Sequence, residues 1–268
     1  MSLRRVDPRF TLPSPPGRVA VLGDLDEWRR GLEAVGVEVL GLDSQRADLV
    51  VAPRALARAA ASLDTQAVIL EGRADRPLAR QRFTNRHYLP RPTVREPAVL
   101  VPLDQPLAAS YAVRRWSIAD RSWKRRRREI AGALLARGRS LPLQPTVTVA
   151  LREPAEPYLV SAAVRELALP AAKQWVLTLG QGDALSRNVF HLFPAGDDAP
   201  TTIVKFARVE GYAEPFDRDE RGLALAASAG PAVAFACGGA ALGVSPPQET
   251  TAKASAHTLG FGHETWRR

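Results

Sequence analysis

One lysine differs from the other basic residues of this chain in its setting. Lysine occupies only four of the 37 basic positions, and Lys205 lies in the middle of an apolar run, TTIVKFARV. Such a residue faces either solvent or a ligand. A compact ammonium on a flexible stem suits phosphate oxygens and a carboxylate at once, whereas a guanidinium fork is bulkier. A carboxylate follows in FDRDERGLALAASAG, where Glu220 leads directly into an apolar stripe.

A glycine-containing turn precedes this lysine. Residues 180–186 read GQGDALS and separate two strand-like runs. Backbone N–H groups of such a turn can point at phosphate oxygens, Gly180 and Gly182 permit a close approach, and Ser186 can add a hydroxyl contact. A plain hairpin turn has the same pattern. No G-K-[ST] follows, which excludes a Walker A loop, and a strand follows where a dinucleotide fingerprint needs a helix.

The elements around these residues occur in a characteristic order. A strand, the turn, a second strand, a hairpin, a third strand with Lys205 and a helix with Glu220 follow one another. Residues 175–230 thereby resemble the N-terminal lobe of the aminoglycoside phosphotransferase and choline kinase family, which is protein-kinase-like. The resemblance implies that the turn covers the phosphates of ATP and that Lys205 contacts the α- and β-phosphates.

The resemblance also implies an ion pair between Lys205 and Glu220, with an N···O distance of about 4 Å or less. Three neighbouring acids could replace Glu220 in this pair, namely Glu214, Asp217 and Asp219.

The resemblance ends after residue 230. In that family a second, larger lobe carries a catalytic aspartate and the groups that hold Mg²⁺. No aspartate follows Asp219 in this chain, and neither His257 nor His263 begins an H-G-D motif. We therefore expect weak ATP binding, no magnesium site and no catalytic residue in this chain. Residues 231–268 are expected to form an irregular tail, from a truncated or frame-shifted end, with the C-terminal lobe absent.

The sequence pattern of residues 18–110 predicts a second structural unit. Four short apolar runs, RVAVLGD, VEVLGLD, ADLVVAP and AVILEGR, alternate with helical patterns at 27–36 and 54–63. This alternation is typical of a parallel α/β sheet. The unit bears a weak resemblance to a class I methyltransferase or a related Rossmann-like fold, but the G-x-G-x-x-G fingerprint is absent. Asp43 is either a ribose-binding acid or an ordinary turn residue. We therefore expect a structural or docking role for this unit.

The predicted fold class is an α/β Rossmann-like unit followed by an α+β kinase-like small lobe. The expected divisions are a disordered Pro-rich leader (1–17), the Rossmann-like domain (18–110), a basic helix and connector (111–170), the kinase-like lobe (171–230) and the tail (231–268).

The formal net charge of +9 favours acidic partners. The one dense basic run, RRWSIADRSWKRRRR at 114–128, is a solvated helix face, a contact surface for phosphate or nucleic acid, or a latch between domains. Its two tryptophans could stack on bases or anchor the helix to the protein body. No recognised nucleic-acid module surrounds the run, so we expect a nucleotide and a protein as partners, and not nucleic acid.

Cysteine usage and apolar patterning bear on the compartment. Cys237 is the single cysteine, which excludes an intrachain disulfide and a cysteine zinc site. The first residues lack the apolar core of a signal peptide. Residues 222–244 carry no charge, but they are mostly Ala and Gly with Pro231 near the middle, so we do not expect a membrane span. These features predict a cytoplasmic protein.

Three functions remain open from the sequence. The first is a phosphotransferase-related protein, whose family transfers phosphate from ATP to a small hydroxylated acceptor, and which is catalytically incomplete in this chain. The second is a non-catalytic nucleotide-binding or scaffold protein. The third is a degenerate S-adenosylmethionine methyltransferase-like protein.

Overall fold

The structure is a computed structural model that describes residues 2–41, 46–115, 122–138, 146–166, 169, 174–183, 186–209, 221, 238–244 and 252–258. Its strands are β1 (Arg18–Val21), β2 (Glu38–Leu40), β3 (Arg46–Pro53), β4 (Asp64–Glu71), β5 (Thr84–Pro92), β6 (Pro97–Pro102), β7 (Val147–Leu151), β8 (Gln174–Leu179), β9 (Arg187–Phe193), β10 (Thr202–Ala207), β11 (Gly238–Val244) and β12 (Ala252–Thr258). Its helices are the 3₁₀ helices η1 (Arg4–Thr11) and η2 (Arg54–Leu56) and the α-helices α1 (Asp26–Ala34), α2 (Ala57–Ser62), α3 (Asp75–Arg80), α4 (Pro106–Arg115), α5 (Ser122–Ala136) and α6 (Tyr158–Glu166).

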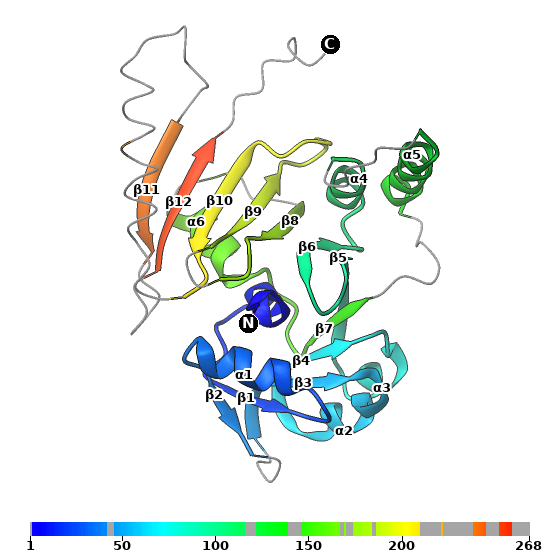
Figure 1. The fold of residues 1–268 in the computed structure, drawn as a ribbon, viewed down its shortest axis with the longest axis vertical. Coiled ribbons are helices and arrows are strands. Elements are labelled where there is room, and N and C mark those ends of the chain that lie inside the picture. Colours follow the sequence, from blue (N-terminus) through cyan, green and yellow to red (C-terminus); the bar gives the residue numbers. More distant parts are fainter. Residues whose placement is uncertain are drawn as a thin grey trace, which may run out of the picture.

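The described strands pair into one mixed sheet of twelve strands, in the order β11-β12-β10-β9-β8-β6-β5-β7-β4-β3-β1-β2. Figure 1 shows the parallel strands at one end of the molecule and the β8–β12 strands at the other. The sheet therefore runs through both units that the sequence predicts.

The parallel end confirms the parallel sheet flanked by helices that the four apolar runs predict for residues 18–72. Strand β1 pairs in parallel with β2 and β3, and β3 pairs in parallel with β4. Helix α1 packs on one face through Trp28 and Leu32, and α2 packs on the other through Ala57 and Ala60. Since helices cover both faces, these strands are apolar almost throughout and not alternating.

Beyond residue 72 the strands are antiparallel, so the parallel expectation for 18–110 is wrong for β5 and β6. These two form an antiparallel pair, as consecutive strands with a short connection can. Strand β7 comes from the expected connector, but it lies between β4 and β5 and is antiparallel to both. All five of its residues are buried, because both of its edges and both of its faces are covered. Pairing between β6 and β8 then joins the two ends of the sheet.

Strands β8, β9 and β10 form the expected antiparallel sheet. The helix predicted after β10 lies outside the described residues, except for Arg221, which is helical. Strand β12 pairs with β10, and β11 pairs with β12. These two strands differ from the irregular tail expected at 231–268. Their sequences show no clear period, and backbone pairing, of β12 with β10 and of β11 with β12, is what defines them.

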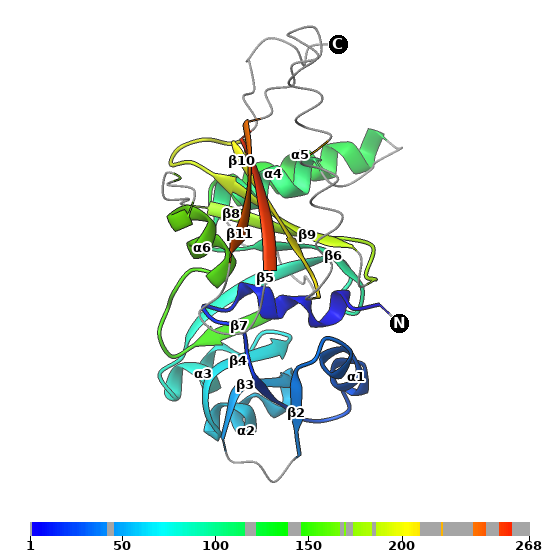
Figure 2. The same ribbon diagram turned by 90° about the vertical axis from the view of Figure 1, so that its left-hand side faces the viewer.

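The leader is not disordered where it is described. Residues 4–11 form η1, in which every residue from Arg5 onward is buried. Val6, Phe10 and Leu12 pack in the main core cluster with strands from both ends of the sheet. Figure 2 shows η1 lying between the parallel end and the β8–β10 end. The Pro-rich, Arg-rich composition does not indicate that this segment is part of the core. Its apolar residues are few, and its buried charged residues have partners within the fold.

The basic run does not form a single described helix. It is divided between the end of α4 and the start of α5, with residues 116–121 outside the described part. The two helices pack closely, since a Cβ added at Gly132 would lie 2.5 Å from Arg114 Nε. Helix α4 also covers β6 and β8 through the cluster that holds Ala108, Ala112 and Val176. None of the helices in the described ranges has both the length and the apolar character needed to cross a membrane.

Candidate functional site

Lys205 lies at the centre of β10, on the sheet face opposite the main core. Its neighbours Val204 and Phe206 are fully buried in the core cluster that includes η1. Side chains alternate along a strand, so Lys205 points to the other face, where it is half-buried. Val189 of β9 is its partner in the pairing register, and Thr178 of β8 is the next residue across.

This face carries a second basic residue and a histidine. By strand alternation Arg187 and His191 share the face of Val189, and both are half-buried. Burial lowers the pKa of His191 to about 4, so this imidazole is neutral at pH 7. Its Nε2 lies 3.3 Å from the hydroxyl of Thr178. Among the described side chains of β8–β10 on this face, Lys205 and Arg187 are therefore the cations at neutral pH.

The glycine-containing turn at 180–186 is bonded within itself. The Ser186 hydroxyl donates to Asp183 Oδ1 at 2.8 Å and accepts from the N–H of Gln181 at 3.0 Å. The Ser186 N–H donates to the same carboxylate oxygen at 2.6 Å. The N–H of Gly180 donates to Asn188 Oδ1 at 3.3 Å. In this structure the predicted contact residue Ser186 thus serves to close the turn.

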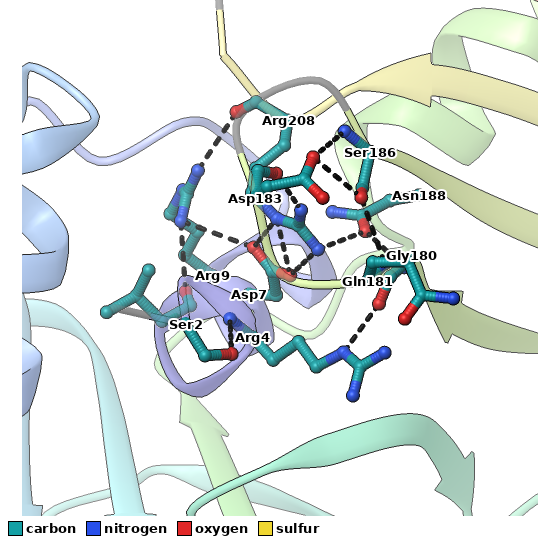
Figure 3. A network of polar contacts seen from close by, with 11 residues as sticks. Ser2, Arg4, Asp7, Arg9, Gly180, Gln181, Asp183, Ser186, Asn188 and Arg208 are labelled. Atoms are coloured by element: carbon teal, nitrogen blue, oxygen red, sulfur yellow. Dashed lines mark hydrogen bonds and ion pairs between the residues drawn. The ribbon is translucent and has the colours of Figure 1, made fainter.

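The N-terminal residues pack against one side of the turn (Figure 3). The N–H of Leu3 donates to the carbonyl of Gly182 at 2.7 Å, and Arg4 Nε donates to the carbonyl of Gly180 at 2.5 Å. Gly182 has a φ of +96°, and a Cβ there would lie 2.5 Å from Ser2 Oγ. This position therefore requires glycine for two reasons, the backbone conformation and the contact with the N-terminus.

A buried ion pair ties the end of β10 to η1. Arg208 and Asp7 are both fully buried, and the guanidinium donates to the carboxylate through Nε at 3.0 Å and Nη2 at 2.9 Å. The same guanidinium donates to the carbonyl of Asp183 at 2.5 Å and to Asn188 Oδ1 at 3.1 Å. Arg9 Nη2 donates to the carbonyl of Arg208 at 3.1 Å. One guanidinium thus connects η1, the turn and β9.

The structure brings together only part of the predicted site. Gly180, Gly182, Ser186 and Lys205 lie in adjoining strands and their connecting turn. Glu220 lies outside the described residues, as do the acids that could replace it, so its pairing with Lys205 stays a prediction.

Sequence reasoning missed the part played by Arg4, Asp7 and Arg208. Two features of the sequence could have indicated these residues. One is the arginine that ends the apolar run TTIVKFAR, and the other is a charged leader whose apolar residues Val6 and Phe10 are four positions apart.

The carboxyl edge of the parallel strands is filled by the protein's own N-terminus. Open α/β sheets bind ligands at this edge. Here Glu71, the last residue of β4, accepts from Arg5 Nε at 2.8 Å, from Arg5 Nη2 at 2.9 Å and from Trp28 Nε1 at 2.8 Å. Arg5 also pairs with Glu27. Asp43 lies outside the described residues. This edge is thus built for contact with η1, which supports the structural role expected for the Rossmann-like unit.

Comparison with known proteins gives no match that identifies the site. No protein-family model matches the chain, and no curated protein matches it. Within the described ranges, no three His, Cys, Asp or Glu side chains gather as a metal site would require.

Proposed function

We propose that the β8–β10 sheet binds the phosphate groups of a nucleotide and that this nucleotide is ATP. We also propose that the protein is related to the phosphotransferases. The observation that carries this proposal is the position of Lys205. It lies in the middle of the third antiparallel strand, on the face opposite the main core cluster, and next to the strand that follows the glycine turn. Kinase-like phosphotransferases hold the nucleotide phosphates with these parts.

The charges on this face suit a polyphosphate. Lys205 and Arg187 supply two cations to this face, while His191 stays neutral. Phosphoryl transfer also needs a base and groups that hold Mg²⁺. We therefore propose nucleotide binding, and not transfer, as the activity of the β8–β10 sheet itself.

Replacing Lys205 with alanine is expected to abolish nucleotide binding. For the unchanged protein we expect a dissociation constant of about 0.05 to 1 mM for Mg-ATP, which corresponds to a binding free energy of roughly 4 to 6 kcal/mol in magnitude. Loss of the ammonium removes the main charge that the phosphates contact, so Lys205→Ala should show no measurable heat in a calorimetric titration. Arg46→Ala, which removes a highly exposed cation from the other end of the sheet, is the matched control and should bind as before. Equal binding by Lys205→Ala and the unchanged protein would place the site elsewhere.

A scaffold function has a separate observation in its favour, on the outer face of α5. Trp123 is 49% exposed and Ile130 is 62% exposed. Arg127 lies between them, with its guanidinium 5.6 Å from the centre of the Trp123 ring. Spacings of four and three residues place these side chains along one helix face. Tryptophan and arginine are the residues that most often dominate protein interfaces. The face therefore suits an acidic protein segment with an apolar side.

The α5 face can be tested with a synthetic amphipathic peptide that carries leucines on one side and glutamates on the other. We expect Trp123→Ala with Ile130→Ser to weaken binding of this peptide roughly tenfold, because both apolar anchors are lost. Fluorescence anisotropy of the labelled peptide measures the change. A peptide in which serine replaces every leucine is the control and should bind the two proteins equally. If the double variant binds the leucine peptide as tightly as the unchanged protein, α5 is not the docking face.

A further inference from the structure

We propose that the N-terminus is a working part of the nucleotide site, in which Arg4 is a positioning residue. In this proposal the contacts of Leu3, Arg4 and Arg208 hold residues 180–183 of the turn so that the backbone N–H groups of Gln181 and Asp183 face the phosphates. The proposal rests on the nucleotide-binding function proposed above and identifies what prepares the turn for it.

Three carbonyl groups of the turn point to the same side. The carbonyl of Gly180 accepts from Arg4 Nε, and the carbonyl of Gly182 accepts from the N–H of Leu3. The carbonyl of Asp183 accepts from Arg208. All three donors belong to the N-terminus or to the guanidinium that η1 holds, and Figure 3 shows two of them, Arg4 and Arg208. The turn is thus fixed by its backbone, at points that a change of side chain within the turn would leave in place.

These carbonyl contacts determine where the N–H groups of the turn point. In a trans peptide unit the C=O of one residue and the N–H of the next lie in one plane and point in opposite directions. The Gly180 carbonyl points to Arg4, so the N–H of Gln181 points away from the N-terminus. By the same argument the N–H of Asp183 points away from Leu3. In the present structure the Gln181 N–H donates to Ser186 Oγ, a bond that a phosphate oxygen could replace.

Lys205 points away from η1 as well. Val204 and Phe206 pack on the core face that Phe10 of η1 also occupies, with the Phe10 and Phe206 ring centres 4.9 Å apart. The side chain between them in the strand therefore lies on the opposite face. Both the lysine and the N–H groups of Gln181 and Asp183 thus point away from the N-terminal residues, and in this proposal an anion contacts both kinds of donor.

Arg4 is the residue through which this arrangement can be tested without unfolding the protein. It is only half-buried, whereas Arg208 is fully buried and paired with Asp7. The Leu3 contact is made by the backbone and remains when the Arg4 side chain is shortened. Arg4→Ala therefore removes one of three anchors of the turn, while the core cluster and Lys205 remain.

The experiment compares Arg4→Ala, Arg4→Lys and the unchanged full chain in calorimetric titrations with Mg-ATP and with adenosine. We expect Arg4→Ala to bind Mg-ATP about tenfold more weakly, as for the loss of one charged hydrogen bond, and to bind adenosine as before. Arg4→Lys, which keeps the charge and one donor, should recover part of the loss. A general loss of structure would weaken the binding of Mg-ATP and of adenosine equally. An equal loss of affinity for the two ligands would therefore overturn the proposal.

Hydrogen exchange at the turn separates this proposal from the function on which it rests. We expect the amide of Gln181 to exchange faster in Arg4→Ala than in the unchanged chain, while amides of β3 do not change. Faster exchange without any Mg-ATP binding by the unchanged chain would support the anchor and refute the nucleotide function. Unchanged exchange and unchanged affinity in Arg4→Ala, with binding lost in Lys205→Ala, would refute the anchor and leave the function standing.

Discussion

Replacing Asp7 with alanine is expected to lower the free energy of unfolding by about 3 to 5 kcal/mol. The substitution leaves the Arg208 guanidinium in the protein interior without its carboxylate, and both side chains are fully buried. A buried charge that loses its partner keeps the cost of desolvation and loses the attraction that offsets it. Urea unfolding followed by circular dichroism measures the change.

Two further variants test the cause of this loss. Asp64 pairs with Arg46 at 3.8 Å, but both side chains are at least 70% exposed, so Asp64→Ala should cost less than about 1 kcal/mol. Asp7→Leu combined with Arg208→Met removes both charges of this pair but leaves buried Arg9, whose Nη1 lies 3.5 Å from Asp7 Oδ1, without a carboxylate, so it should recover only part of the stability lost in Asp7→Ala. A cost for Asp7→Ala as small as that for Asp64→Ala would mean that water reaches the Arg208 guanidinium.

Replacing Glu71 with alanine is expected to cost roughly 3 kcal/mol of unfolding free energy. This carboxylate accepts two hydrogen bonds from Arg5 and one from the indole of Trp28. Arg5 is only 8% exposed and Trp28 is 1% exposed, so water replaces these bonds poorly. Thermal unfolding with a calorimeter measures the loss.

Glu27 provides the matched control for this prediction. It pairs with the same Arg5, but its side chain is 51% exposed. Glu27→Ala should therefore cost less than about 1 kcal/mol, because water solvates the group in both states. If the two variants were equally stable, Glu71 would not be the residue that holds η1 at the edge of the parallel strands.

Local patterns in the sequence predict much of the fold. The apolar runs that become β1, β3 and β4 are recognisable because both faces of these strands are covered, and the alternation with helices indicates parallel pairing. The β8–β10 sheet is predicted by its turns and by the strand that carries Lys205. Strand β7 is recognisable as a strand, but its place between β4 and β5 depends on pairing with residues far away in the chain. No local pattern encodes that choice.

The candidate site divides in the same way. Lys205 and the glycines of the turn are identified by their types and by their order along the chain. Asp7 and Arg208 lie 201 positions apart, and each alone resembles an ordinary surface charge in the sequence. Their pairing follows from the position of η1 between the two ends of the sheet, which only the folded chain shows (Figure 2).

The position of η1 also sets an order for the assembly of the chain during synthesis. Residues 4–11 leave the ribosome before their partners, which become available in two stages, since Glu71 lies 66 positions after Arg5 and Arg208 lies 201 positions after Asp7. Contacts between distant positions form more slowly than local ones, and N-terminal units generally fold first. The parallel strands can thus capture η1 early through Arg5, while its other side stays uncovered until β10 emerges. A helix that is made before its partners then becomes the surface on which the later strands assemble.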